Sequence, residues 1–201
     1  MLGFCYNIKA QDEYFIRKHP KLEAEVNQAI YDRYVDDKGL LFLGTDSGLV
    51  SFDGVTVENY SFENHLSFSI DAIQQAPDGT LWCKNFSNEI FYLEKNKLKK
   101  DKILSDYLKQ STSLFRDFKF IEDEIYILLE KELIKYNIEN QKLQVLISPI
   151  DKTNSFYDFD YDKSTKNLIL LSNGSVYFIK DDQLKSIQKL EFDTPNIFCI
   201  K

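Results

Sequence analysis

Cysteine, histidine, glycine and proline are all scarce in this chain, whose 201 residues include 3 cysteines, 2 histidines, 7 glycines and 4 prolines. Cys5, Cys83 and Cys199 lack the paired spacing of a zinc site, and their odd number does not suit a disulfide framework. Cys83 lies in an apolar run and is expected to be a small core residue. Few glycines and prolines beside 12 tyrosines and 16 phenylalanines favour β-strands over disorder.

The chain also lacks an excess of positive charge and a long apolar run. Its formal net charge of −7 provides no field that would attract nucleic acid or an anionic membrane. The basic run at residues 95–102 is expected to be a solvated edge strand or turn, because lysines on edges block sheet-to-sheet association. No segment approaches the roughly 18 consecutive apolar residues that a membrane-spanning helix needs.

The N-terminus begins with an apolar stretch, MLGFCYNIKAQ, that ends just before acidic residues. Residues 1–11 are therefore interpreted as the remnant of a secretory signal peptide whose charged front is missing. The alternative is a disordered or strand-like leader.

A repeat of about 40 residues organises the rest of the chain. The segment DDKGLLFLGTDSGLVSFDG at residues 36–54 has a partner 40 residues later, so that Gly39 corresponds to Gly79, Phe42 to Trp82 and Phe52 to Tyr92. A third copy lies at residues 122–138, with Tyr126 in the place of Trp82, and a fourth lies at residues 164–182. The short apolar runs LLFLG, TLWCK, IYILL and LILLS predict strands that are covered on both faces, as in stacked sheets.

Each repeat can be divided into four strands separated by turn sequences. In the first copy these are residues 29–35, 40–44, 48–52 and 55–60, and in the fourth copy 156–162, 167–172, 175–180 and 183–187. Residues 20–26 and 102–110 suit short helices instead. Four antiparallel strands in each 40 to 45 residues predict an all-β fold built from β-propeller blades.

The predicted organisation is a partial propeller over residues 12–201, with repeats at about 26–66, 67–110, 111–153 and 154–192 and the start of a fifth at 193–201. Four blades and one extra strand leave a sheet face uncovered, so an incomplete ring is expected. The alternative is a complete small propeller or stacked array.

Residues 26–54 resemble the two-component regulator propeller repeat. The matching elements are the Asp-x-x-Gly turn ending at Gly39, the pair Gly44-Thr45, the pair Gly48-Leu49 and the Phe52-Asp53-Gly54 ending. The second copy keeps the tryptophan of this repeat in Trp82 but not its Gly-Thr and Gly-Leu pairs, and later copies keep little beyond spacing. The resemblance implies a periplasmic sensor propeller, found in Bacteroidetes-type proteins ahead of a membrane-spanning helix and a histidine kinase or DNA-binding output, none of which this chain contains.

Chemical motifs are few. No nucleophile elbow, phosphate-binding glycine loop or metal-binding histidine pair is present, so no catalytic residue, metal ligand or cofactor is predicted. In residues 155–164, Asp158, Asp160 and Asp162 alternate with aromatic residues. Same-face residues on one strand lie nearly ~7 Å apart, too far for three carboxylates to share one Ca²⁺, so packed rings with solvated acids are preferred to a calcium site.

In a propeller, the turns between each blade's second and third strands gather at one rim, where ligands often bind. These turns contain the predicted ligand-binding residues Asp46, Ser47, Asn85, Ser87, Glu130 and Asn173. Such small polar groups suit a small molecule or an oligosaccharide.

Three functions are compatible with these features. The first is a ligand-sensing propeller of a two-component protein, in which ligand binding favours one arrangement of two sensor chains. The second is a propeller scaffold that binds another protein. The third is an enzyme such as a polysaccharide lyase, which would need a clustered acid–base pair that the sequence does not offer. We expect the first, with no nucleic-acid partner and with membrane attachment only through a helix downstream of this segment.

Overall fold

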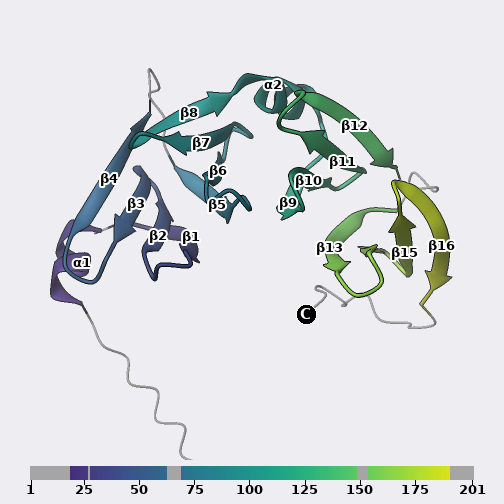
Figure 1. The fold of residues 1–201 in the computed structure, drawn as a ribbon, viewed down its shortest axis with the longest axis horizontal. Helices are drawn as coiled ribbons and strands as arrows, with labels where there is room; N and C mark the ends of the chain where they lie inside the picture. Colours follow the sequence, from purple (N-terminus) through teal and green to yellow (C-terminus); the bar gives the residue numbers. More distant parts are fainter. Residues whose placement is uncertain (1–18, 27, 63–68, 149–153, 191–201) are drawn as a thin grey trace, which may run out of the picture.

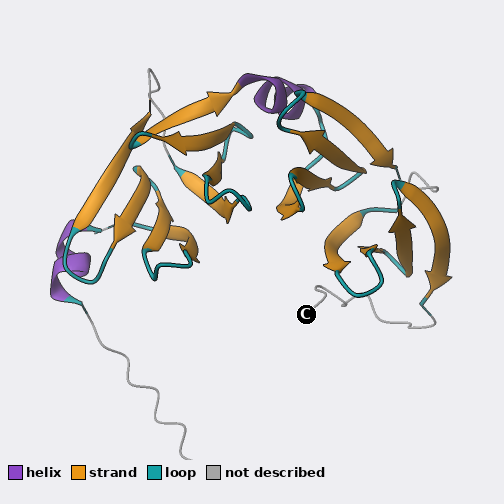
Figure 2. Cartoon of the chain, viewed as in Figure 1, coloured by secondary structure: helices purple, strands orange, loops and turns teal. Residues whose placement is uncertain are grey.

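A computed structural model of the chain describes residues 19–26, 28–62, 69–148 and 154–190. The expected signal remnant at residues 1–11 and the expected start of a fifth repeat at residues 193–201 lie outside the described residues. In the described part, strands make up nearly all of the regular structure, and two short helices lie among them (Figure 2).

The strands form four consecutive antiparallel units of four, which we call blades 1 to 4. Blade 1 contains β1 (Ile30–Val35), β2 (Leu41–Thr45), β3 (Gly48–Phe52) and β4 (Val57–Phe62), and blade 2 contains β5 (Ile70–Gln75), β6 (Leu81–Asn85), β7 (Ile90–Glu94) and β8 (Lys97–Asp101). Blade 3 contains β9 (Phe115–Ile121), β10 (Glu124–Leu129), β11 (Glu132–Asn137) and β12 (Lys142–Ile147), and blade 4 contains β13 (Phe156–Asp162), β14 (Asn167–Ser172), β15 (Ser175–Lys180) and β16 (Gln183–Lys189).

The blades follow one another along an arc, with the first strand of each blade, β1, β5, β9 and β13, on the concave side (Figure 1). Within each blade every strand pairs antiparallel with the next. The middle strands β2, β3, β6 and β10 are buried along nearly their whole length, which the apolar runs predicted, whereas β16 is exposed throughout. The predicted fold of four-stranded propeller blades is therefore confirmed.

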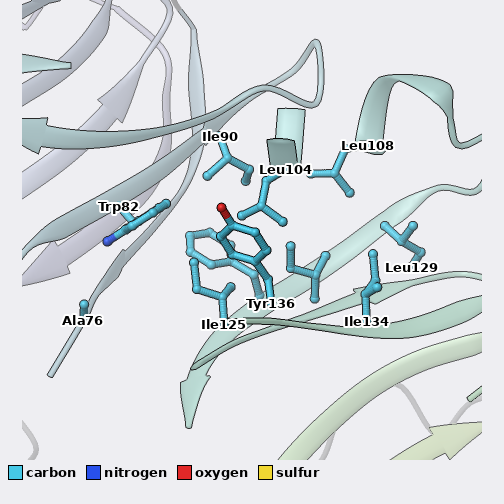
Figure 3. Packing of buried hydrophobic residues seen from close by; sticks show 11 residues of the cluster. Ala76, Trp82, Ile90, Leu104, Leu108, Ile125, Leu129, Ile134 and Tyr136 are labelled. Atoms are coloured by element: carbon cyan, nitrogen blue, oxygen red, sulfur yellow. The ribbon is translucent and has the colours of Figure 1, made fainter. Parts of the chain in front are cut away.

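Hydrophobic side chains fill the seams between neighbouring blades. Phe42, Ile70 and Phe91 belong to the seam between blades 1 and 2, and Cys83 is fully buried there, as expected for a core cysteine. Trp82 and Tyr136 belong to the seam between blades 2 and 3 (Figure 3). A third cluster, which includes Phe156, Phe159, Leu170 and Tyr177, joins blades 3 and 4. Since each seam buries apolar surface from two blades, the seams stabilise the arrangement of the arc.

The outermost strands of blades 1 and 2 also pair with each other. In this parallel contact Ser61 lies opposite Lys97 and Phe62 opposite Leu98, so the two blades form one eight-stranded sheet. The basic run at residues 95–102 supplies β8, whose Leu98 is buried. Residues 95–96 form an exposed turn, as expected, but β8 is not the expected solvated edge strand, because Lys97 and Leu98 pair with β4.

Both helices lie where the sequence suggested short helices. Helix α1 (Pro20–Glu25) begins with a proline, and Leu22 and Val26 pack on Leu43 and Val50 of blade 1. Helix α2 (Lys102–Gln110) follows β8 and buries Leu104 and Leu108 in the seam between blades 2 and 3. Asp101 caps its N-terminus by accepting a hydrogen bond from the Leu104 amide at 2.9 Å. No helix of the described residues has the length and apolar character needed to cross a membrane.

Candidate functional site

One face of the arc carries the turns β2–β3, β6–β7, β10–β11 and β14–β15 together with the starts of the innermost strands; we call it the β2–β3 face. Backbone hydrogen bonds define this arrangement. The Glu130 amide donates to the Leu114 carbonyl of its own blade at 2.7 Å, and the Phe156 amide of the next blade donates to the Glu130 carbonyl at 2.8 Å. Five of the six residues predicted from the sequence lie in these four turns, and the sixth, Asn85, is the last residue of β6.

In the β2–β3 turn, Asp46 and Ser47 are exposed. The Tyr31 hydroxyl donates a hydrogen bond to the Asp46 carboxylate, and this bond raises the pKa of the Tyr31 phenol. The Ser47 amide donates to the Gln28 side-chain oxygen at 2.9 Å. Tyr31 also contacts the ring of Phe86 from the β6–β7 turn edge to face, with centroids 4.7 Å apart. The Asp46 carboxylate therefore lies at the surface with Tyr31 of β1, which contacts Phe86 of the β6–β7 turn.

Asn85 ends β6 beside the β6–β7 turn and is buried, and both ends of its side-chain amide form hydrogen bonds. Its side-chain oxygen accepts from the amides of Ser87 and Glu89 at 3.0 and 2.8 Å, and its nitrogen donates to Glu89 at 2.8 Å. Although burial opposes the change, hydrogen bonds from Lys109, Lys100 and Asn85 lower the pKa of Glu89 to about 2. Asn85 thus maintains the turn from a buried position, whereas Ser87 is exposed.

In blades 3 and 4 the predicted residues join the two blades. Ser155 donates to the Glu130 carboxylate at 2.7 Å, and the Lys131 ammonium donates to the Asn154 carbonyl at 2.8 Å. The Asn173 amide donates to the Ser155 carbonyl at 3.2 Å, and its side chain is exposed. Glu130 therefore has a structural role in addition to its place in the turn.

Sequence reasoning missed a repeated irregularity in the innermost strands. Each of these strands has a register shift near its start, where one residue bulges out of the ladder: Tyr31 in β1, Asp71 in β5, Arg116 in β9 and Tyr157 in β13. The Arg116 guanidinium lies over the Tyr157 ring at 5.7 Å. We call Tyr31, Phe86, Arg116 and Tyr157 the aromatic collar, since three of them are rings and the fourth covers one.

Directly after the bulges, Asp32, Asp117 and Asp158 occupy equivalent positions, and Ala72 takes this place in blade 2. The second Asp32 carboxylate oxygen accepts from the Ile73 amide of blade 2 at 2.7 Å. The triplets Ile-Tyr-Asp, Phe-Arg-Asp and Phe-Tyr-Asp at residues 30–32, 115–117 and 156–158 were the sequence signal for this acidic row.

The acidic row has a measurable electrostatic consequence. Burial raises the pKa of Asp117 to about 6, the Asp158 and Asp32 carboxylates raise it too, and Lys119 opposes the change. Because the folded-state pKa exceeds the ordinary value of 3.8, Asp117 makes the folded state less stable as the pH rises from about 4 to about 6, and its effect is constant above that window.

We expect carbon-detected NMR to show the Asp117 carboxyl titrating near pH 6, and Asp158→Asn to lower that midpoint because one like charge is removed. The matched control is Asp123→Asn, which removes an exposed charge from the β9–β10 turn. A titration midpoint of Asp117 near 4, or an equal change of the midpoint in the control variant, would show that the neighbouring carboxylates do not raise the pKa of Asp117.

The alternating acidic residues of the segment 155–164 have different partners and do not share one site. Phe159 is fully buried, Asp160 lies 3.5 Å from the Lys119 ammonium, and Asp162 accepts from the hydroxyls of Ser164 and Thr165 at 2.7 and 2.6 Å. Within the described ranges, no three His, Cys, Asp or Glu side chains gather in a way that could hold a metal ion.

Comparisons with known proteins agree on the fold. No sequence-family model and no curated protein matches the chain. An inactive virginiamycin B lyase from Staphylococcus aureus, crystallised with quinupristin, superposes with a TM-score of 0.64 at 15% identity, over 84% of this chain and 57% of the lyase. The WD40 propeller domain of Doa1 superposes with a TM-score of 0.59 at 8% identity, over 86% of this chain and 56% of the Doa1 domain.

A third similar structure is the extracellular domain of BT3049 from B. thetaiotaomicron, a protein assigned to the hybrid two-component systems. It gives a TM-score of 0.54 at 21% identity, over 81% of this chain and 22% of that one. The chain thus spans little more than half of the lyase and about a fifth of the BT3049 domain. At these identities the similarity establishes the propeller fold alone.

Proposed function

We propose that this chain is an extracytoplasmic ligand-sensing propeller segment of a two-component signalling protein, and that it binds a small molecule or glycan on its β2–β3 face. The repeat resemblance of residues 26–54 supports the class of protein, and the likeness to the extracellular domain of BT3049 agrees with it. In this proposal, the kinase or regulator that receives the signal is a separate domain outside the propeller segment.

The aromatic collar is the observation that carries the binding proposal. Tyr31 and Phe86 are 44% and 56% exposed although both are large rings, and Tyr31 donates a hydrogen bond to the exposed carboxylate of Asp46. Exposed rings next to a few polar groups are typical of ligand sites. The apolar C–H face of a sugar ring packs on such side chains while its hydroxyls donate to a carboxylate.

We expect Tyr31→Ala or Phe86→Ala to weaken binding of the best ligand in a panel of oligosaccharides about tenfold, or ~1.4 kcal/mol, as measured by isothermal calorimetry. The matched control is Leu184→Ala on β16, which removes an apolar side chain of similar exposure, 41%, far from the collar. Equal affinity in all three variants would remove the collar from the site.

A protein-binding scaffold remains the second candidate, because Ile30 and Leu114, 51% and 61% exposed, extend the apolar surface beside the collar. In that case Tyr31→Ala would abolish capture of a protein partner while no sugar or small molecule bound. The two functions are separated by whether the collar variants lose binding of a sugar or small molecule, or capture of a protein.

A further inference from the structure

A cavity of about 290 Å³ opens between blades 2 and 3 on the face opposite the collar, where the turns β1–β2, β5–β6 and β9–β10 lie. Its lining includes Asp78, Thr80, Trp82, Tyr92, Glu94 and Asp101. This volume is near the lower end for small-molecule sites, so the cavity suits a ligand the size of a monosaccharide or an amino alcohol. The cavity shares no residue with the β2–β3 face.

Trp82 supplies an unused hydrogen-bond donor to this cavity. The residue is only 3% exposed, and one side of its ring packs in the seam with Ile90, Leu104 and Ile125. Figure 3 shows the indole nitrogen turned away from these aliphatic side chains. Within the described residues this N–H donates no hydrogen bond, and its nitrogen is not among the fully buried polar atoms without a partner, so it reaches the water-filled cavity. A ligand atom in the cavity can therefore accept this hydrogen bond in place of water.

The charge of the lining is negative. Asp78, Glu94 and Asp101 are its ionisable carboxylates, and no lysine, arginine or histidine belongs to it. Glu94 is paired with Lys99, and Asp101 caps α2 and accepts from the Tyr136 hydroxyl at 3.0 Å. Asp78 accepts from the Thr80 amide at 2.8 Å through one oxygen. The excess negative charge favours a cation over an anion.

The seam between blades 3 and 4 indicates which chemical group suits the cavity between blades 2 and 3. Tyr126 occupies in blade 3 the repeat position of Trp82, and its ladder partner Lys135 takes the place of Tyr92, the partner of Trp82. The Lys135 ammonium lies 6.0 Å from the Tyr126 ring centre and bonds to Glu124 at 2.9 Å and Asp182 at 2.6 Å. Between blades 3 and 4, an ammonium of the chain thus sits over an aromatic ring between carboxylates.

The seam between blades 2 and 3 also has an aromatic ring and carboxylates, although Thr80 occupies the repeat position of Glu124. The lysine is replaced by Tyr92, whose ring centre lies 5.2 Å from that of Trp82. We propose that this cavity binds a small organic cation that carries a protonated amine beside a hydroxyl group. The amine takes the place that Lys135 fills in the next seam, near Asp78 and the ring of Tyr92. The hydroxyl oxygen accepts the hydrogen bond from the Trp82 N–H.

The chain contains a single tryptophan, so its fluorescence reports on this cavity directly. Glucosamine is the probe, glucose the control with the same ring and no charge, and N-acetylglucosamine the control with a neutralised nitrogen. We expect glucosamine to change the Trp82 emission saturably, with an affinity about tenfold above that of either control, and with weaker binding at high salt.

Two variants sharpen the test. Asp78→Asn keeps the turn and removes one charge, and we expect it to weaken glucosamine binding about two- to fivefold. Its matched control is Asp37→Asn in the exposed β1–β2 turn of blade 1, which should leave binding unchanged. Trp82→Phe, followed by calorimetry, should cost a further three- to tenfold, roughly the effect of one hydrogen bond.

The proposal is overturned if glucosamine leaves the emission unchanged, if glucose binds equally well, or if the two aspartate variants behave alike. Tyr31→Ala separates it from the proposed function, because that collar variant should leave glucosamine binding intact. If no ligand binds at the collar while glucosamine binds in the cavity, the proposed function is wrong and the cavity proposal stands. If a ligand binds at the collar while glucosamine does not bind, the cavity proposal alone is wrong.

Discussion

Lys84→Met is expected to lower the free energy of unfolding by about 3–5 kcal/mol, because it leaves a buried carboxylate without its cation. The side chains of Lys84 and Asp71 are 5% and 16% exposed, and their charged atoms are 2.6 Å apart. Burial lowers the pKa of the Lys84 ammonium, and the Asp71 carboxylate opposes that change. The ammonium also lies 4.6 Å from the centre of the Phe115 ring in blade 3, so one side chain connects two blades.

Urea unfolding followed by circular dichroism measures this effect. The double variant Lys84→Met with Asp71→Asn should recover most of the lost stability, since the buried charge is removed as well. Lys142→Met on the exposed β12 position is the matched control and should change stability by less than about 0.5 kcal/mol. A loss below 1 kcal/mol in the single variant would show that the pair does not stabilise the fold.

Gly44→Ala is expected to cost about 1–3 kcal/mol by forcing blades 1 and 2 apart. A Cβ at this position would lie 2.6 Å from the Ile70 carbonyl oxygen and 3.0 Å from its Cγ2 atom. Main-chain atoms cannot yield without moving β5. Gly44 belongs to the Gly-Thr pair of the repeat, so a close approach between blades explains why glycine stands there.

Hydrogen exchange at the Ile73 amide checks this prediction, because that amide bonds to Asp32 across the same seam. Gly44→Ala should accelerate its exchange. Gly39→Ala is the control: a Cβ there meets nothing within 4 Å, and only its positive φ of 83° makes alanine unfavourable. Equal exchange rates at Ile73 in both variants would contradict a steric role for Gly44.

Much of the fold could be predicted from the sequence, because strands buried on both faces leave unbroken apolar runs. In blade 4 the first three strands begin and end where the pattern placed them, at residues 156–162, 167–172 and 175–180. The weaker copies lacked turn glycines for a physical reason. Glu122 and Lys166 have positive φ, 54° and 56°, in the turns where Gly39 and Gly79 have positive φ in blades 1 and 2.

The candidate site was predicted only in outline. The turn residues could be placed on one face because turn position follows strand order, and Asp46, Ser47 and Asn173 are exposed there. The bulges that present Tyr31 and Arg116 depend on strand register, which composition does not reveal. Likewise, whether the tryptophan N–H at position 82 finds a partner depends on how blade 3 packs against blade 2.

The most direct test of the central claim is to read the gene on both sides of this coding segment. A sensor segment predicts further propeller repeats downstream, then a membrane-spanning helix and a kinase or regulator, and an export signal completed upstream. A stop codon after residue 201 followed by an unrelated gene would contradict the signalling role, and would leave a propeller-type binding protein that acts without a kinase.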